Sequence, residues 1–298
     1  MAANETWTVG RLLQWTTDYL KSRGADTPRL DAEVLLAEAL GCKRIELYTA
    51  FEEVPKDEQR TAFREFVRRR AEGSPVAYLV GRREFYSLNF KVGPGVLVPR
   101  PETELLVVAV LDSAKARQKD GQPEAGPLAI ADVGTGSGIL AVCAAKYLRT
   151  ARITAIDTSR AALAIAAENA AAHNVADRID FLDSDLFAAV PPEQKFDFVL
   201  SNPPYVSTAE ATKLPRDVKD FEPPEALVAG PRGTEVIERL IPQAAERLTV
   251  GGHLLIEISP MIHDSVQKLL AAESRLEPGP TIKDLARLPR VVQAKRRA

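Results

Sequence analysis

The chain of 298 residues contains only two cysteines and three histidines. Cys42 and Cys143 lie far apart, each in an apolar, helix-like pattern, so we interpret both as small buried hydrophobic residues and expect no disulfide. His173, His253 and His263 show neither the i, i+4 spacing nor the cysteine company of a zinc site. We therefore expect no bound metal and no chemistry based on a metal or a thiol.

Net charge and long apolar runs are also scarce. The 39 basic side chains nearly balance the 41 acidic ones, which leaves a formal charge of -2 and no bulk attraction to nucleic acid or anionic membranes. No apolar run approaches the ~18 residues that would span a bilayer. The first residues, MAANETWTVGRLL, lack the basic-then-apolar pattern of a signal peptide. We expect a cytoplasmic monomer with no membrane and no direct nucleic-acid partner.

Residues 1–80 show helical periodicity and no convincing strand. Pro28 stands at a first-turn position, and Gly24, Gly41 and Gly73 stand just past the ends of apolar patterns. These signals predict a small helical bundle as the first domain. Its expected helices cover residues 9–24, 28–41 and 55–73.

The character of the sequence changes over residues 81–99. GRREFYSLNFKVGPGVLV alternates aromatic and aliphatic residues around Gly93, Pro94 and Gly95, which predicts a β-hairpin. We interpret this segment as the linker between two domains. The second domain then covers residues 100–298.

From residue 128 onward, short β-rich runs alternate with helical runs. Runs that are apolar on both faces, such as RITAID and FDFVLS, are typical of strands in a parallel sheet that helices cover on both sides. The predicted fold class is therefore α/β. In this architecture ligands bind at the carboxyl ends of the strands, so the loops at those ends are the candidate site.

The loop after the first of these strands reads ADVGTGSGIL. Gly134, Gly136 and Gly138 let the backbone turn tightly and approach a ligand without a Cβ in the way, and the next helix presents free N–H groups. A dinucleotide fingerprint would place a small residue three positions after Gly136, but Ile139 stands there. The phosphate-cradling form of the motif is therefore not matched. A glycine-rich turn without a ligand is the alternative.

The second strand of this domain ends in Asp157, which stands 23 positions after Gly134. A carboxylate at this offset can accept the hydroxyl protons of a ribose. Asp157 would alternatively, or in addition, cap the helix that begins at Thr158 and Ser159.

The third strand ends in LDSDLF. Asp185 could hold an amino group of a base there, while Leu186 and Phe187 pack against the face of the base. An ordinary loop is equally consistent with this segment.

The fourth strand leads into FDFVLSNPPYVST, where no histidine, cysteine or lysine accompanies the polar residues. An amine conjugated to a carbonyl or a ring is a poor nucleophile, and its prior deprotonation would need a very strong base. If the Asn202 side-chain oxygen and the Pro203 carbonyl accept its two N–H protons, the nitrogen lone pair can face an electrophile. Pro204 stiffens the turn, and Tyr205 offers a ring face to the planar group. The electrophile must already be activated, as a sulfonium methyl group is; a plain turn is the alternative.

These motifs resemble a known family. ADVGTGSG, the acidic end of the second strand and SNPPY together are similar to class I S-adenosylmethionine-dependent methyltransferases that act on a planar nitrogen. GVLVPRPETELLV, DFEPPEALVAG and IKDLARLPRVVQAK narrow the resemblance to the release factor glutamine methyltransferases, the HemK/PrmC family. The resemblance covers essentially the whole chain. It implies a Rossmann-like, mostly parallel seven-stranded sheet, preceded by a helical domain that, with the hairpin, grips the protein substrate.

The resemblance also implies roles for individual residues. The substrate would be the side-chain amide of the glutamine in the Gly-Gly-Gln loop of peptide chain release factors. This amide would be bound and methylated in a site formed by Asn202, Pro203, Pro204 and Tyr205, with S-adenosylhomocysteine as product. Members often carry glycine where this chain has Ala286 or Arg287, and some carry an aromatic residue at the position of Leu186. Arg100 and Glu102 would border the cofactor and peptide site. The residues that would hold S-adenosylmethionine are Gly134, Thr135, Gly136, Ser137, Gly138, Asp157, Asp185, Leu186 and Asn202.

Other functions stay open at this point. A glutamine of a ribosomal protein, or an adenine amine of a nucleic acid, presents a planar nitrogen to the same four residues, although the near-neutral charge weighs against a nucleic acid. A nucleotide-binding module without catalysis is a hypothesis from another class. An NAD-dependent oxidoreductase is disfavoured by Ile139.

Three consecutive arginines, Arg68, Arg69 and Arg70, suggest a basic patch. They alternate with Glu65 and Glu72 on a predicted helix, so we interpret them as a solvated face with no part in catalysis.

Overall fold

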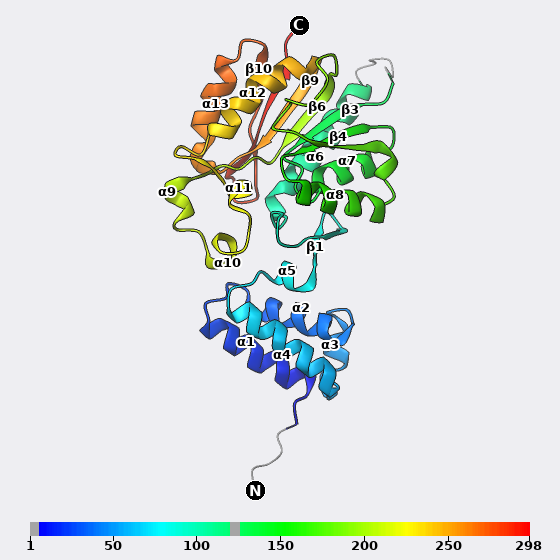
Figure 1. Ribbon diagram of the computed structural model, residues 1–298, viewed down its shortest axis with the longest axis vertical. Helices are drawn as coiled ribbons and strands as arrows, with labels where there is room; N and C mark the ends of the chain where they lie inside the picture. The colour runs from blue at the N-terminus through cyan, green and yellow to red at the C-terminus, as the bar shows by residue number, and fades with distance from the viewer. Residues whose placement is uncertain (1–5, 120–125) are drawn as a thin grey trace. The chain divides into compact units, whose positions relative to one another are not determined.

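The computed structural model of the protein describes residues 6–119 and 126–298. It contains two compact units, and Figure 1 labels many of their helices and strands. The helical unit comprises Met1–Arg82 and Pro215–Phe221, and the sheet unit comprises Arg83–Leu214 and Glu222–Ala298. The sequence predicted that the first domain ends at residue 80 and that residues 215–221 belong to the second domain. In the structure, those seven residues belong to the helical unit.

The helical unit buries a core of leucines between short helices. The Thr8 side chain accepts the Arg11 N–H at the start of α1, Pro28 begins α2, and Gly41 ends α2 in the left-handed conformation. The three helices expected from the sequence are present, whereas α3, α5 and α10 were not predicted. The bounds are α1 (Val9–Ser22), α2 (Pro28–Leu40), α3 (Glu46–Thr49), α4 (Asp57–Ala71), α5 (Val76–Val80) and α10 (Arg216–Lys219).

Arg68 and Arg70 of α4 differ in their exposure to solvent and in their partners. Arg68 is exposed and pairs with exposed glutamates of its own helix. The Arg70 side chain is only 11% exposed and pairs with Asp31 at 2.8 Å and with Asp217 at 3.4 Å. The prediction of a solvated face is therefore wrong for Arg70, which fastens residues 215–221 to the helical unit.

The sheet unit is built on a mostly parallel sheet, as predicted. Seven strands follow the order β10-β12-β9-β6-β3-β4-β5, and the short β11 also pairs with β12. Strands β5, β4, β3, β6 and β9 run parallel, whereas β12 is antiparallel to β9 and to β10. The bounds are β3 (Ala129–Val133), β4 (Arg152–Asp157), β5 (Ile179–Asp183), β6 (Phe196–Ser201), β9 (Leu248–Glu257), β10 (Leu276–Pro278), β11 (Ile282–Lys283) and β12 (Pro289–Arg296).

Strand order decides where a ligand can bind. From β3 the chain moves outward through β4 to β5 and then returns to place β6 on the other side of β3. Connections from the carboxyl ends of β3 and β6 therefore leave in opposite directions, which opens a crevice between them. The glycine loop follows β3, and the SNPPY segment begins at the end of β6.

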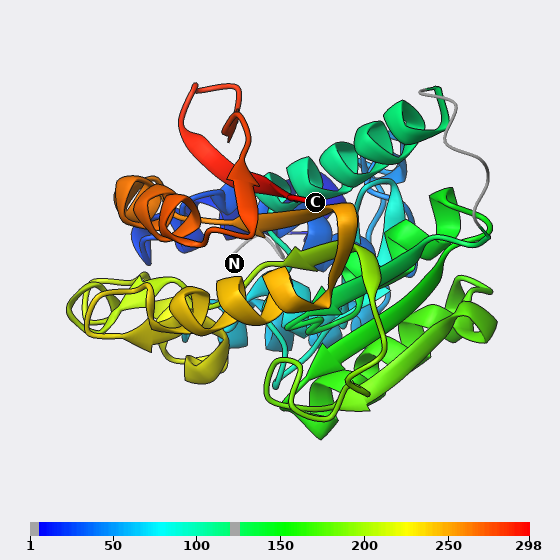
Figure 2. The ribbon, with the colours of Figure 1, turned by 90° about the horizontal axis from the view of Figure 1, so that it is seen from above.

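Alternating side chains bury both faces of this sheet. Ile130 and Phe198 pair in register and face α6 and α7, while their neighbours Ala131 and Val199 face α12. Figure 2 shows α6 and α12 on opposite sides of the sheet. The bounds of the covering helices are α6 (Glu104–Lys119), α7 (Ile139–Tyr147), α8 (Arg160–Ala172), α12 (Glu235–Arg247) and α13 (His263–Ala272).

The predicted hairpin is present as β1 (Arg82–Phe85) and β2 (Leu88–Lys91). Its turn lies at Tyr86 and Ser87, which have φ values of 48° and 59°, and not around the glycines at 93 and 95. The Asn169 side chain of α8 accepts the Lys91 N–H at 2.7 Å and donates to the Lys91 carbonyl at 3.0 Å. The hairpin strand β2 is therefore held on the sheet unit.

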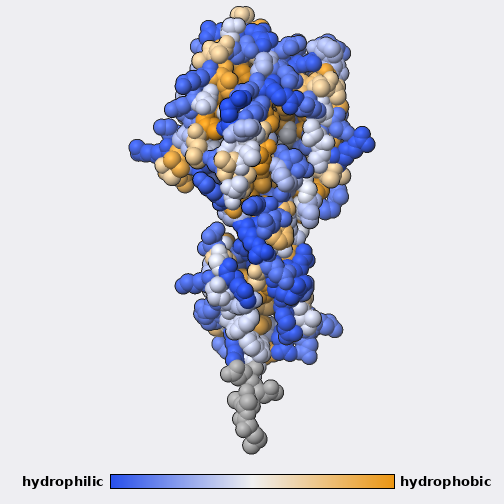
Figure 3. Space-filling view, turned by 60° about the vertical axis from the view of Figure 1, so that its left-hand side comes forward, coloured by the Kyte–Doolittle hydropathy of each residue, from blue (hydrophilic) through white to orange (hydrophobic). Residues whose placement is uncertain are grey.

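Short elements complete the sheet unit. On the face drawn in Figure 3, hydrophilic side chains cover most of the surface and hydrophobic ones form small patches between them. The remaining bounds are η1 (Pro101–Thr103), η2 (Ala176–Arg178), η3 (Pro260–Ile262), β7 (Val206–Ser207), β8 (Val228–Gly230), α9 (Thr208–Ala211) and α11 (Pro224–Leu227).

Both cysteines are free, with Cys143 buried and Cys42 half-buried. Residues 6–119 and 126–298 contain no group of three or more histidine, cysteine or carboxylate side chains that could hold a metal ion. Within the same ranges, none of the helices combines the length and the apolar composition needed to cross a membrane.

Candidate active site

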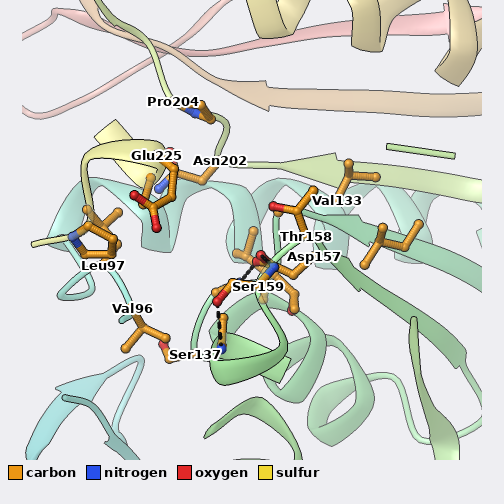
Figure 4. Close-up of a pocket in the computed structure, with 18 of the residues that line it drawn as sticks. Val96, Leu97, Val133, Ser137, Asp157, Thr158, Ser159, Asn202, Pro204 and Glu225 are labelled. Carbon is orange, nitrogen blue, oxygen red and sulfur yellow. Dashed lines mark hydrogen bonds between the residues drawn. The ribbon is translucent and has the colours of Figure 1, made fainter. Parts of the chain in front are cut away.

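A cavity of about 260 Å³ lies at the carboxyl ends of β3, β4 and β6. Figure 4 shows Asn202 and Pro204 in the upper part of this site and Ser137, Asp157 and Ser159 below them. The strand order reverses at this place, as in other open α/β sheets that bind ligands. Of the residues expected to form the site, those that line the cavity are Gly134, Thr135, Gly136, Ser137, Asp157, Asp185, Leu186, Asn202 and Pro204.

The glycine loop has a backbone that other residues rarely adopt. Gly134, Gly136 and Gly138 have φ values of 76°, 54° and 81°, all in the left-handed region. A Cβ on Gly138 would lie 2.9 Å from the Ala166 Cβ, so glycine is also needed there for close packing of α8. Gly138 is the N-cap of α7 and is not among the residues that line the cavity.

Asp132, near the end of β3, fixes the glycine loop through hydrogen bonds. Its Oδ2 accepts the Thr135 hydroxyl at 2.7 Å and the Ala141 N–H at 3.0 Å, which joins the loop to the first turn of α7. Burial raises the pKa of this carboxyl to about 7. Asp132 stands within ADVGTGSG and had no predicted role, although an acid inside an apolar strand indicates a structural or functional contact.

Asp157 contacts the glycine loop from the neighbouring strand. Its Oδ2 accepts the Gly136 N–H at 2.8 Å, and its Oδ1 accepts the Ser159 N–H at 2.9 Å. Each carboxylate oxygen keeps a further lone pair for a ligand hydroxyl. The cap of α8 is provided by Ser159, whose side chain accepts the Ala162 N–H, so capping does not occupy Asp157.

The loop after β5 contributes a polar and an apolar side chain to the cavity lining. Asp185 pairs with Arg239 at 2.5 Å, and both line the cavity. Leu186 is buried, with a φ of 50°. Phe187 was expected to pack on a base, but its ring lies in the core, 6.0 Å from that of Phe196.

The segment after β6 approaches the glycine loop closely. The buried Ser201 hydroxyl donates to the Val133 carbonyl at 2.7 Å and ties the ends of β6 and β3 together. A Cβ built on Gly134 would lie 4.0 Å from the Asn202 carbonyl oxygen. The Asn202 side chain donates from Nδ2 to the Thr103 Oγ1 at 3.3 Å. The two motifs recognised in the sequence thus form one site.

Tyr205 lies behind this site, not among the residues that line the cavity. Its hydroxyl is 3.4 Å from Oε1 of Glu257, at the carboxyl end of β9. Burial is the main cause that raises the pKa of both side chains, that of Glu257 to about 7. Sequence reasoning missed Glu257, although an acid at the end of the apolar run HLLIEI was a signal. Pro203 is likewise buried outside the cavity lining.

The PRPETE segment borders the cavity through residues other than the two expected. Pro99 and Thr103 line it, whereas Arg100 and Glu102 do not. Arg100 pairs at 2.5 Å with Glu222, a buried carboxylate of the DFEPPEALVAG motif. The motif and the PRPETE segment are therefore linked by an ion pair beside the cavity.

Glu102 points to the carboxyl-terminal motif. Its Oε1 lies 3.6 Å from Arg290, which also donates to Asp284 at 2.8 Å. Asp284 in turn accepts the Leu288 N–H at 2.9 Å and so closes the loop that contains Arg287. Arg290 joins the IKDLARLPRVVQAK and PRPETE motifs.

Comparisons with known proteins match two separate parts of the chain to family models. The family model described as PrmC N-terminal domain matches residues 11–81, and the model described as Methyltransferase small domain matches residues 122–216. Among solved structures, the hMettl16 catalytic domain in complex with a 3′UTR hairpin has a TM-score of 0.56 and 16% identity, covering 76% of this chain and 80% of that chain. This likeness shows the fold of class I methyltransferases.

Curated relatives match almost the whole chain. The release factor glutamine methyltransferase of Rhodopirellula baltica is 50% identical over 97% of both chains. The protein of the same name from Koribacter versatilis is 40% identical over 92% of this chain and 93% of its own. The chain belongs to the family of release factor glutamine methyltransferases.

Proposed function

We propose that this protein methylates the side-chain amide nitrogen of the glutamine in the Gly-Gly-Gln loop of peptide chain release factors, using S-adenosylmethionine. The observation that carries the proposal is that Asn202 and Pro204 line the same cavity as Gly134, Gly136 and Asp157. A planar-nitrogen motif and a nucleoside motif thus share one site. The names of the curated relatives support release factors as substrate.

The residues of the cavity fit S-adenosylmethionine. Gly134 and Gly136 line the cavity, and both have a left-handed backbone conformation. Because glycine has no Cβ, a ligand can approach the backbone closely at these two positions. Asp157 keeps lone pairs for ribose hydroxyls after accepting the Gly136 and Ser159 N–H groups. Leu186 gives the wall an apolar surface against which a base can pack. When bound, S-adenosylmethionine supplies a methyl group already activated by a sulfonium centre.

The protein's own residues act by orienting the glutamine amide of the substrate. The Asn202 Oδ1 and the Pro203 carbonyl would accept the two N–H protons of the glutamine amide and turn its lone pair toward the methyl group. As the nitrogen becomes positive, both acceptors hold it more strongly, which stabilises the transition state. No histidine, lysine or cysteine occurs among the described residues that line the cavity. The proton can leave after transfer, when the nitrogen has become strongly acidic.

The rest of the chain would serve the protein substrate. We assign the grip on the release factor to the helical unit and the hairpin β1-β2. Arg100, Glu102 and Tyr205 would support the segments around the cavity through their contacts with Glu222, Arg290 and Glu257. The near-neutral charge favours a protein over a nucleic acid as partner. In this proposal the enzyme works as a monomer in the cytoplasm, where release factors act.

Transfer of a labelled methyl group tests the proposal. The protein is incubated with S-adenosylmethionine carrying a labelled methyl group and, in parallel, with a release factor, ribosomal proteins, DNA or RNA. Label on the release factor, and none with Asn202→Ala, supports the proposal. Label found only on a ribosomal protein or on nucleic acid would identify that molecule as the substrate in place of the release factor. Binding of S-adenosylmethionine without transfer to any of them would indicate a binding module.

A further inference from the structure

The side-chain amide of Asn169, on α8, has a partner in the glycine loop as well as in the hairpin strand β2. The side chain is 2% exposed. Its Nδ2 donates to the Lys91 carbonyl at 3.0 Å and to the Ser137 carbonyl at 2.8 Å, and its Oδ1 accepts the Lys91 N–H at 2.7 Å. Both amide protons and the amide oxygen therefore have partners. A buried amide that is satisfied in this way holds its partners at fixed positions.

The partners also fix the orientation of the Asn169 amide. Only the Nδ2 protons can satisfy the two carbonyl oxygens, and only Oδ1 can accept the Lys91 N–H. Asn169 thus pairs with both polar groups of the Lys91 backbone, as a residue of a neighbouring strand would. Its remaining proton is used for the glycine loop.

The bond to Ser137 holds one peptide of the glycine loop from a second side. The Gly138 N–H of this peptide donates to the Thr135 carbonyl at 2.8 Å, while Asn169 donates to its Ser137 carbonyl. Gly136 and Ser137 both line the cavity. A loop that is ordered before a ligand enters loses less entropy on binding. The Asn169 bond should therefore contribute to cofactor affinity.

One face of α8 carries the contacts with both segments. Ala166 packs so closely against the glycine loop that a Cβ on Gly138 would lie 2.9 Å from the Ala166 Cβ. His173 donates from Nε2 to the Asn89 carbonyl of β2 at 2.8 Å. Residues three and four positions apart share a helix face. The helix therefore places Asn169 between the glycine loop and β2.

We propose that Asn169 is a positioning residue for both binding steps, because its single amide holds the glycine loop for S-adenosylmethionine and strand β2 for the release factor. Asn169 is not among the residues that line the cavity, so it acts through the backbones of Ser137 and Lys91. The part that concerns the release factor rests on the proposed function, which assigns the grip on that protein partly to the hairpin β1-β2.

Steady-state kinetics of Asn169→Ala test the inference. Loss of the amide frees both backbones, so the KM for S-adenosylmethionine and the KM for the release factor should each rise by about tenfold, while kcat stays within about threefold of the parent. A variant that was merely less folded would have a lower apparent kcat and two unchanged KM values, because its folded molecules would bind as the parent does. That result would overturn the inference, as would a rise in only one of the two KM values.

His173→Ala is the matched control on the same face of α8. It removes a contact with β2 and leaves the bond between Asn169 and Ser137. The KM of this variant for S-adenosylmethionine should equal that of the parent. A rise as large as that of Asn169→Ala would show that the position of α8, and not the Asn169 amide, determines cofactor affinity, and the inference would be wrong.

Hydrogen exchange of the parent protein tests the same link without a substitution. Bound S-adenosylhomocysteine should fix the glycine loop and, through Asn169, strand β2. The Lys91 N–H, which Asn169 accepts, should then exchange more slowly by about threefold or more. An exchange rate in residues 88–91 that does not respond to S-adenosylhomocysteine would contradict the inference, whether or not Asn169→Ala folds.

The inference and the proposed function can fail separately. If the parent transfers no methyl group to a release factor, the proposed function fails, and the release-factor part of the inference fails with it. The Kd of S-adenosylhomocysteine for Asn169→Ala then decides the cofactor part, which a rise of about tenfold supports and the parent value overturns. A parent that methylates a release factor, beside an Asn169→Ala variant with both parent KM values, defeats the inference alone.

Discussion

The Asp157 carboxylate accepts the N–H of Gly136 at 2.8 Å, so an acid at the end of β4 holds the loop that follows β3. The same carboxylate accepts the Ser159 N–H at the start of α8. Asp157 is therefore fixed by two backbone donors before any ligand enters. A ribose would meet an oriented acceptor, which reduces the entropy lost on binding.

Removal of this carboxylate should weaken cofactor binding. Asp157→Ala removes the proposed acceptor of the ribose hydroxyls and also frees Gly136, so the Kd of S-adenosylmethionine should rise by the equivalent of about 1 to 3 kcal/mol. Titration calorimetry measures the change. Asp183→Ala, at the end of β5 and outside the cavity lining, is the control and should bind as the parent does. Parent-like affinity in a folded Asp157→Ala protein would refute the role.

Asn202 should affect turnover more than binding. Asn202→Ala removes an acceptor that works chiefly in the transition state, so kcat should fall on the order of a hundredfold to a thousandfold. Single-turnover kinetics with a release factor would separate the chemical step from binding. A kcat equal to that of the parent would contradict the orientation mechanism.

Asn202→Asp distinguishes orientation from base catalysis. The variant keeps an acceptor of the same shape but adds a carboxylate, which would act as a base if one were needed. We expect no gain of activity at raised pH, because the amide cannot be usefully deprotonated before transfer. A rate that climbs with the titration of the new carboxylate would show that proton removal limits the reaction.

Much of the site follows from local sequence. Gly134, Gly136 and Gly138 were assigned from the need for a turn without Cβ atoms, and all three have positive φ. The apolar runs around Asp157 and Ser201 predicted parallel strands, because strands buried on both faces need apolar residues throughout. The carboxyl ends of such strands meet at one edge, which is why the two motifs could be expected to share a site.

Features that depend on distant packing could not be predicted. Thr103 and Asn202 are 99 positions apart, and only the fold brings the Thr103 Oγ1 to 3.3 Å from the Asn202 Nδ2. Arg100 was expected to border the cofactor and peptide site, yet it pairs with Glu222 from a distant motif. The hairpin turn lies at Tyr86 and Ser87, which both have positive φ although neither is a glycine. The sequence therefore gave no local signal for the position of this turn.

Arg70 of α4, whose side chain is 11% exposed, should contribute far more to stability than the exposed Arg68. Arg70→Ala leaves Asp31 buried without its cation, so the free energy of unfolding should fall by about 3 to 5 kcal/mol. Arg68→Ala, on the same helix, removes only exposed ion pairs and should change the free energy of unfolding far less. Urea denaturation of the two variants measures the difference. Equal losses would mean that the Arg70 pair is not a structural contact.

The departure from the family at Arg287 has a physical consequence. Arg287 has a φ of 64°, a conformation that suits the glycine often found there in relatives. Arg287→Gly should therefore raise the free energy of unfolding by about 0.5 to 1 kcal/mol, after allowance for the greater freedom of glycine in the unfolded chain. Ala286→Gly is the control, since Ala286 has no positive φ and should lose stability. Thermal denaturation measures both, and a less stable Arg287→Gly variant would contradict the argument.

The most direct test of the account is the mass of one peptide. A release factor is incubated with the protein and S-adenosylmethionine and then digested, and tandem mass spectrometry locates any added methyl group. We predict one methyl group on the side-chain amide of the glutamine in the Gly-Gly-Gln loop, and none when the Asn202→Ala variant replaces the parent enzyme. An unmodified glutamine, or a methyl group on another residue of the release factor, would contradict it.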